Sequence, residues 1–124
     1  MVQNDSQIII YQTEAGQTKI DVRLENETVW LTQDQMATLF CKAKSTINEH
    51  IKNIFAEGEL QEDTAIKKFG NSEFQQKSPN FYNLDVIISV GYRVKSLQGT
   101  QFRIWATQRL KELEQDIKQL ESQS

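Results

Sequence analysis

The chain of 124 residues is poor in cysteine, proline and glycine, with one Cys, one Pro and five Gly. The single cysteine, Cys41, cannot close an internal disulfide, which excludes a disulfide-stabilised secreted scaffold. No basic segment followed by an apolar run opens the sequence, so we expect no signal peptide. The longest apolar stretch, around residues 86–90, is far too short to span a bilayer. A soluble cytoplasmic protein without a membrane partner is therefore expected.

Patterns that carry catalysis are also scarce. His50 is the only histidine, and no third group accompanies His50 and Cys41 as an activated nucleophile requires. No His, Cys or carboxylate cluster has metal-ligand spacing, and no glycine-rich phosphate loop is present. We therefore expect no enzymatic activity, no metal, no cofactor and no small-molecule substrate. A nuclease whose carboxylates converge only in space is the enzyme alternative.

Charge is unevenly distributed along the chain, whose net charge is −3. Residues 1–35 hold six acids and two bases, and residues 112–124 hold four acids and one base. The segment 36–111 consequently holds seven acids and eleven bases, and no acid occurs within residues 86–111. This polarisation fits an anion-facing middle with solvated ends, although eleven cations are also ordinary for a surface of this size.

Hydrophobic periodicity predicts an α+β fold. Residues 7–11 and 18–24 form a hairpin pattern, and a short strand follows at 29–31. The segment 64–82 is expected to be either a two-stranded wing or an irregular connector. The predicted helices begin at Thr32, at Ser45 or Thr46 with a stop at Gly58, at residue 84 after an Asn83 cap, and at Thr100. The expected architecture is thus an N-terminal β-hairpin, a winged helix-turn-helix-like unit, a buried helix and a long C-terminal helix.

Residues 33–52 have the pattern of a helix-turn-helix. Such a unit needs a small residue where the helices cross, and Ala37 supplies it ten residues before Ile47. The turn position that usually holds glycine is occupied by Cys41, which must adopt a positive φ at some strain. A plain helical hairpin is the alternative. The apolar residues expected to pack the two helices together are Met36, Phe40, Ile47 and Ile51.

The second helix of this unit would expose a polar and basic face toward DNA. Its N-terminal residues are expected to meet base edges in the major groove, while free N–H groups there suit phosphate oxygens. Asn48 and Asn53 are candidates for adenine and Lys44 for guanine. Arg103, outside this helix, is also expected to contact a DNA phosphate. The predicted DNA-binding residues are Lys42, Lys44, Ser45, Thr46, Asn48, Glu49, Lys52, Asn53 and Arg103.

The C-terminal helix carries a short seam with coiled-coil spacing. Its apolar residues recur at steps of four, three, four and three, and Arg109 is expected near the centre of the stripe, paired at an interface. The seam predicts a homodimer. A protein-interaction module of antirepressor type, docking through the same seam, is the alternative function. The predicted dimerisation residues are Ala106, Arg109, Leu110, Leu113, Ile117 and Leu120.

The strings VWLTQDQMATLF, STINEHIKNIFAEGEL and FYNLDVIISVGYRVKSLQGTQFRIWATQRLKE resemble the N-terminal region of the RhuM virulence-protein family. The resemblance runs from about Ile8 to Glu112 and implies a RhuM-like domain over 1–112 with a helical extension over 113–124. Members of this family are bacterial and mobile-element proteins, many with a larger C-terminal region. More remotely, Phe102–Trp105 resembles the end of the BRO- and KilA-type N-terminal modules, which are regarded as DNA-binding.

Taken together, these patterns predict sequence-specific binding of double-stranded DNA by a homodimer. The expected context is the regulation of transcription or of a mobile element.

Overall fold

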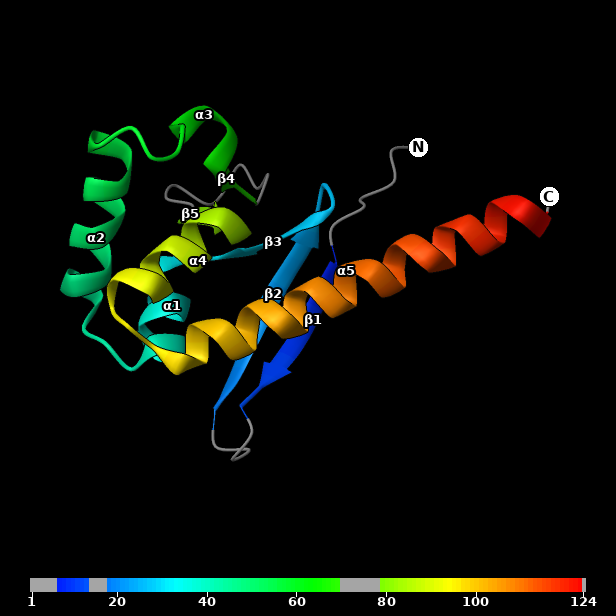
Figure 1. The fold of residues 1–124 in the computed structure, drawn as a ribbon, viewed down its shortest axis with the longest axis horizontal. Helices are drawn as coiled ribbons and strands as arrows, with labels where there is room; N and C mark the ends of the chain where they lie inside the picture. Colours follow the sequence, from blue (N-terminus) through cyan, green and yellow to red (C-terminus); the bar gives the residue numbers. More distant parts are fainter. Residues whose placement is uncertain (1–6, 14–17, 70–78, 124) are drawn as a thin grey trace, which may run out of the picture.

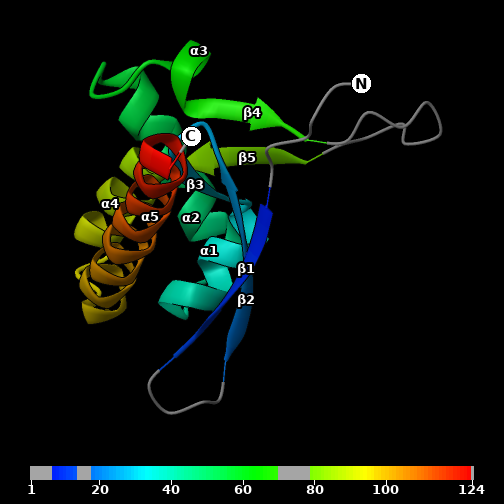
Figure 2. The ribbon, with the colours of Figure 1, turned by 90° about the vertical axis from the view of Figure 1, so that its right-hand side faces the viewer.

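A five-stranded antiparallel sheet with helices packed against one face forms the molecule (Figures 1 and 2), and this confirms the predicted α+β class. The structure is a computed structural model that describes residues 7–13, 18–69 and 79–123, with the side chains of 117–123 outside the described part. In chain order the elements are β1 (Gln7–Gln12), β2 (Lys19–Glu25), β3 (Thr28–Leu31), α1 (Gln33–Phe40), α2 (Lys44–Ala56), α3 (Glu62–Ala65), β4 (Ile66–Lys68), β5 (Asn80–Asn83), α4 (Leu84–Arg93) and α5 (Leu97–Gln123).

The predicted N-terminal hairpin is confirmed. β1 and β2 pair antiparallel along their whole lengths, and β2 buries Ile20, Val22 and Leu24 while exposing residues between them. This alternation follows from the two-residue period of a strand. Asn26 and Glu27 connect β2 to β3 with φ values of 56° and 60°. Positive φ at both central positions lets a two-residue turn match the twist of its strands.

The segment 64–82 contributes two strands to the same sheet. β4 pairs with β5, and β5 pairs in turn with β3, so the strand order is β1-β2-β3-β5-β4. Residues 70–78 lie outside the described residues. For the residues on either side of them, the two-stranded alternative is confirmed and the irregular connector is wrong.

The first helix begins as its capping box predicts. The Thr32 hydroxyl accepts from the Gln35 N–H at 3.1 Å, and the Gln35 side chain accepts from the Thr32 N–H at 2.8 Å. Cys41 ends α1 at φ 55° and ψ 47°, the left-handed conformation expected of a residue in the glycine position. The N–H of Lys42 then donates to the Ala37 carbonyl at 3.0 Å and closes the turn.

The predicted cap of the second helix, Ser45 or Thr46, is wrong by two or three residues. Ala43, at φ −65° and ψ 147°, is the N-cap of α2, and no side chain caps this end. The turn Cys41–Ala43 reverses the chain within three residues, so Ser45 and Thr46 already lie in the first helical turn. The predicted stop is confirmed, because Gly58 has φ 78° two residues after the helix ends.

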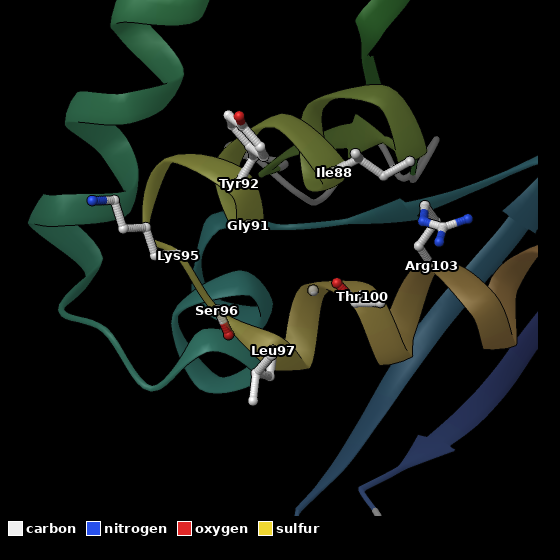
Figure 3. A pocket seen from close by; sticks show the side chains of 9 residues that line it. Ile88, Gly91, Tyr92, Lys95, Ser96, Leu97, Thr100 and Arg103 are labelled. Carbon is white, nitrogen blue, oxygen red and sulfur yellow. The ribbon is translucent and has the colours of Figure 1, made fainter.

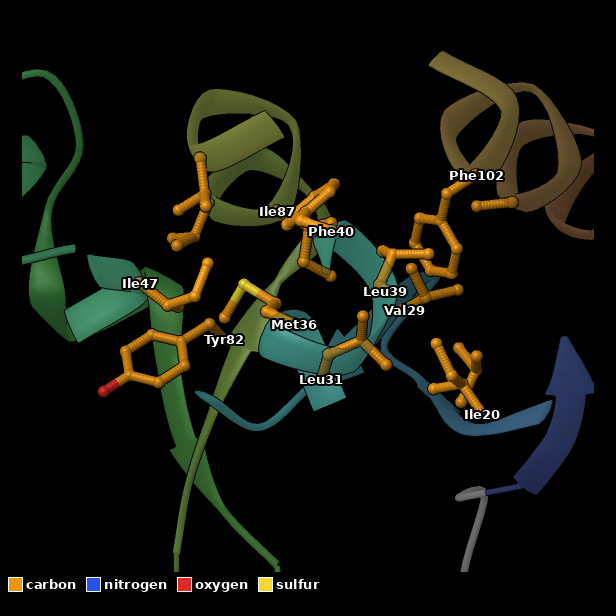
Figure 4. Packing of buried hydrophobic residues seen from close by; sticks show 14 of the residues in the cluster. Ile20, Val29, Leu31, Met36, Leu39, Phe40, Ile47, Tyr82, Ile87 and Phe102 are labelled. Atoms are coloured by element: carbon orange, nitrogen blue, oxygen red, sulfur yellow. The ribbon is translucent and has the colours of Figure 1, made fainter. Parts of the chain in front are cut away.

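The main core fills the space between the sheet and the helices (Figure 4). In this view Phe102 of α5 reaches toward Leu39 and Val29, while Ile47 of α2 faces Met36. Trp105 packs against this core. The core residues with the largest fully buried side chains are Phe102, Leu31, Met36, Leu39, Ile47, Ile54, Ile87, Val22, Val29, Val86 and Val90.

Trp30 is buried but lies on the opposite face of the sheet. Its neighbours in β3 point into the main core, so the alternation of the strand turns Trp30 away from it. There it meets the Phe69 ring edge-on at 5.7 Å, and the Arg23 guanidinium lies 4.5 Å from the centre of the same ring. Trp30 is thus buried in a second, smaller cluster, which Phe69 and Phe81 complete.

Two expectations about the last helices are corrected. Asn83 caps α4 as predicted, by accepting from the Val86 N–H at 3.1 Å, but Tyr92 is exposed, so the helix predicted to be buried is not buried all round. α5 starts three residues early, at Leu97, and Ile104 is 56% exposed. α5 packs beside α4 (Figure 2) and, through Phe102 and Trp105, against Tyr11 of β1, whereas the side that carries Ile104 faces solvent. The predicted domain boundary at 112/113 falls inside α5 and stays a prediction.

Candidate nucleic-acid interface

The α2 helix has one buried and one exposed face. Ile47, Ile51 and Ile54 are buried against the core, at the helical spacing of three to four residues. The predicted contact residues follow the other face. Lys42 and the α2 residues Lys44, Ser45, Glu49, Lys52 and Asn53 are exposed, whereas Thr46 and Asn48 are half-buried. The structure therefore brings eight of the nine predicted DNA-binding residues together on α2 and the turn before it.

The N-terminus of α2 favours an anion. Its first intrahelical bond runs from the Ile47 N–H to the Ala43 carbonyl at 3.1 Å, so the three preceding N–H groups lie ahead of the helical ladder. The first turn contains no acidic residue. Lys42 and Lys44 add positive charge at the same end, where the helix dipole is also positive.

Lys44 is not a free cation in this arrangement. Its Nζ lies 3.2 Å from Asp34 Oδ1 on α1, and both side chains are well exposed, at 60% and 75%. An exposed ion pair of this kind stabilises a fold by less than about 1 kcal/mol. Lys44 can consequently exchange Asp34 for another anion at little cost, although Asp34 lowers the positive charge of the surface.

A polar network fixes α2 relative to α1 and the sheet. The Gln33 amide donates to Asn48 Oδ1 at 2.9 Å and to the Tyr82 hydroxyl at 3.3 Å. Asn48 thereby uses the oxygen that a bidentate adenine contact requires as an acceptor. Asn53 has no side-chain hydrogen bond within the described residues. Of the two predicted adenine readers, the geometry favours Asn53.

A second network, which sequence reasoning missed, joins α4 to the loop after α2. Arg93 Nη2 donates to Glu57 Oε1 and to Glu59 Oε1, both at 2.8 Å, and the Ser89 hydroxyl donates to Glu59 Oε2 at 2.6 Å. The Ser89 hydrogen bond and then Arg93 lower the pKa of Glu59, and the two carboxylates raise the pKa of Arg93. The one sequence signal for this network is the lack of acidic residues close to Arg93, which indicates that its carboxylate partners lie far away in the chain.

The Arg93→Gln variant should lose about 1 kcal/mol of unfolding free energy at neutral pH, because two partly exposed ion pairs are removed. Since the folded-state pKa of Glu59 is lowered, its stabilisation is complete above the ordinary glutamate pKa of about 4.3 and is lost as pH falls through the lowered value. Urea titrations of both proteins from neutral to acidic pH should therefore converge at low pH.

Arg109→Gln is the matched control for this prediction, because Arg109 makes only an exposed pair with Glu112. It should cost a few tenths of a kcal/mol. A stability difference between Arg93→Gln and the parent that persists unchanged at acidic pH would contradict the assignment to carboxylate partners.

Arg103, the ninth predicted DNA contact, lies apart from α2. It is exposed on α5, where its side chain points into the space between α4 and α5 (Figure 3). The helical spacing correctly predicts that Arg103 faces outward. Because α4 packs beside α5, however, Arg103 lies in a different environment from the lysines of α2.

Most described apolar residues of the predicted dimer seam pack against the core of their own chain instead of facing a partner. Ala106 is fully buried in the core, and Leu110 and Leu113 pack against that core. Ala106 is therefore corrected to an internal contact. Arg109 is not central to the apolar stripe but exposed, with Nη1 3.2 Å from Glu112 Oε1. The side chains of Ile117 and Leu120 lie outside the described residues, and the dimer itself stays a prediction.

Two further features of the described residues are negative. No group of three or more His, Cys, Asp or Glu side chains among them is arranged to hold a metal ion. None of their helices combines the length and apolarity that crossing a membrane requires. His50 is half-buried in α2.

Part of the chain matches a known protein family. Residues 60–120, just under half of the chain, match the RhuM virulence protein family, which confirms the predicted resemblance over these residues. The matched part runs from the end of the loop after α2 to α5, and α1 and α2 precede it. The match does not suggest catalysis. No curated protein and no solved structure matches the chain.

Proposed function

We propose that this chain binds double-stranded DNA with sequence specificity. Its residues 60–120 match the RhuM virulence protein family. In this proposal α1 and α2 form a helix-turn-helix, α2 enters the major groove, and β4 and β5 form the stem of a wing. The observation that carries it is the exposed face of α2, where polar and basic side chains follow a helix N-terminus without acidic residues. A helix inserted into the major groove contacts base edges through such N-terminal residues.

The surroundings of α2 support its role as a rigid reading element. The capped helix α1 and the left-handed turn at Cys41 hold it at one end, and the Gln33 network ties it to Tyr82 of β5. The base of the β4–β5 pair is thus fixed relative to α2. Rigid placement matters because base readout depends on hydrogen bonds whose atoms must align within a few tenths of an ångström.

A homodimer is part of the proposal. One α2 helix offers few cations, and two copies reading half-sites about 34 Å apart would double the contacts. Regulation of transcription or of a mobile element, in the cytoplasm, is the proposed context. Because Ala106, Leu110 and Leu113 already pack inside the chain, they support neither a dimer through these residues nor the alternative, an antirepressor that docks through the α5 seam.

The first test is retention on DNA. We expect the chain to bind a pool of random duplexes at low salt, with log K falling linearly with log salt by about 0.9 per phosphate contact. Fluorescence anisotropy over a salt series measures the slope, and selection from the pool tests specificity. Failure to bind any duplex at low salt would exclude the proposed function. Sedimentation as a monomer at high concentration, free and on DNA, would exclude the dimer.

A further inference from the structure

A hollow of about 450 Å³ lies between α4 and α5, outside the proposed DNA-binding surface (Figure 3). Its volume falls within the range of about 300–1,000 Å³ that is usual for small-molecule sites. We call it the α4–α5 hollow. It is lined by Ile88, Gly91, Tyr92, Lys95, Ser96, Leu97, Gly99, Thr100 and Arg103. All nine residues fall within the part of the chain that matches the RhuM family.

Two glycines set the shape of this hollow. A Cβ atom on Gly91 would lie 3.1 Å from the Phe40 ring and 3.3 Å from the Gly99 Cα, and one on Gly99 would meet the same groups at 3.3 Å. Larger residues at either position would therefore push α5 away from α4 and α1. The helices touch at the two glycines, and the hollow lies alongside this contact. The shape of the hollow is therefore set by closely packed helices.

The charge of the hollow is positive and uncompensated. Its lining includes Lys95 and Arg103 but no acid, and residues 86–111 contain none. Neither cation forms an ion pair with any residue that the structure describes. Arg93 on the same α4 helix is bound by two glutamates. Arg103 points between the helices with its guanidinium available, and such a fork binds carboxylate or phosphate through two parallel hydrogen bonds.

The rim of the hollow is apolar and exposed. Tyr92 is 85% exposed and Leu97 82%, the highest values among the large hydrophobic residues in the described chain. Ile88 extends the apolar wall beside Arg103 (Figure 3). Large apolar side chains that gather at a concave, cationic surface are typical of a binding site. An apolar body held against Ile88 would cover surface that otherwise faces water.

We propose that the α4–α5 hollow binds a small organic anion, namely an aromatic or apolar body that bears a phosphate or carboxylate group. Arg103 holds the anionic group, the Thr100 hydroxyl can donate to it, and Ile88 covers the body. The site is independent of DNA binding by α2. It assigns Arg103 a ligand different from the DNA phosphate that its sequence context suggests.

The test is to titrate the full 15N-labelled chain with small probe molecules and to monitor binding through the amide chemical shifts. The probes are phenyl phosphate, benzoate, inorganic phosphate and phenol. Phenyl phosphate or benzoate should give saturable shifts centred on Gly91, Ser96 and Thr100, with an affinity above that of phosphate or phenol alone. The two aromatic anions distinguish phosphate from carboxylate as the preferred group. The absence of saturable shifts with both would overturn the proposal.

Arg103→Gln should weaken the better probe by about 10-fold or more, since a charge-assisted hydrogen-bond pair is lost. Because the Arg103 side chain is exposed, the variant should fold, and its unfolding free energy checks this. Lys111→Gln, an exposed cation on the same helix outside the hollow, should bind the probe as the parent does.

Equal probe affinity in Arg103→Gln and the parent would show the site to be elsewhere and refute the assignment. A fall in duplex affinity for Arg103→Gln, with no probe binding by the parent, would make Arg103 a DNA contact and likewise refute it. Failure of the chain to bind DNA would leave the titration unaffected, so the two proposals fail separately.

Discussion

Replacing Phe102 with alanine should lower the free energy of unfolding by about 3–5 kcal/mol. Phe102 is fully buried where α5 crosses the sheet, and its ring lies 5.1 Å from the Tyr11 ring and 5.6 Å from the Trp105 ring. The truncation removes the apolar surface of the ring and leaves a cavity that β1 and α5 cannot close. Because domains of this size are stable by about 5–15 kcal/mol, the loss is a large part of the total.

Urea unfolding, followed by Trp fluorescence and by circular dichroism, measures this loss as a lower midpoint at an unchanged slope. Ile104→Ala is the matched control, because Ile104 lies two residues away on the same helix but is more than half exposed. It should change stability by less than about 1 kcal/mol. A loss below about 1 kcal/mol for Phe102→Ala would mean that α5 is not docked on the sheet as described.

Replacing both Lys44 and Lys52 with glutamine should weaken DNA binding by about 10- to 100-fold at moderate salt. Both side chains are exposed on α2, one near its start and one two turns later, where they can meet phosphates on either side of the groove. Each lost phosphate contact should reduce the salt slope by about 0.9. Anisotropy titrations of the double variant and the parent over the same salt series give both quantities.

The control for charge alone is the double variant Lys19→Gln and Lys111→Gln, which removes two exposed lysines from β2 and α5. It should leave the salt slope almost unchanged. Asp34→Asn should act in the opposite direction and raise affinity several-fold, because it releases Lys44 and removes a nearby negative charge. Equal losses for the two lysine pairs would show that binding is non-specific and not centred on α2.

Much of the fold could be predicted because its signals are local. Thr32 with Gln35 and Asn83 with Val86 satisfy helix N–H groups within three residues, so a short stretch of sequence carries the whole cap. The alternation in β2 and the left-handed Cys41 are local in the same sense. The start of α2 was predicted wrongly because Ser45 and Thr46 are good caps by type, yet the turn after Cys41 already ends at Ala43.

Features that depend on distant segments were not predictable. The Arg93 network joins residues 34 and 36 positions apart, and no periodicity relates them. The α5 seam has the same spacing whether it packs on a partner or on the chain's own core. Only the tertiary packing of α5 decides that Ala106 is internal and that Arg109 faces solvent.

By itself, the sequence determined the class of the fold, the caps of α1 and α4, the stop after α2 and the amphipathic face of α2, since each follows from the propensity and spacing of neighbouring residues. Tertiary structure alone decided which face of α5 is covered and that Asn48 is held by Gln33. It also decided that Gly91 and Gly99 meet to leave a cationic hollow beside Arg103. These outcomes rest on contacts between elements far apart in the chain, whose free energies depend on packing in three dimensions.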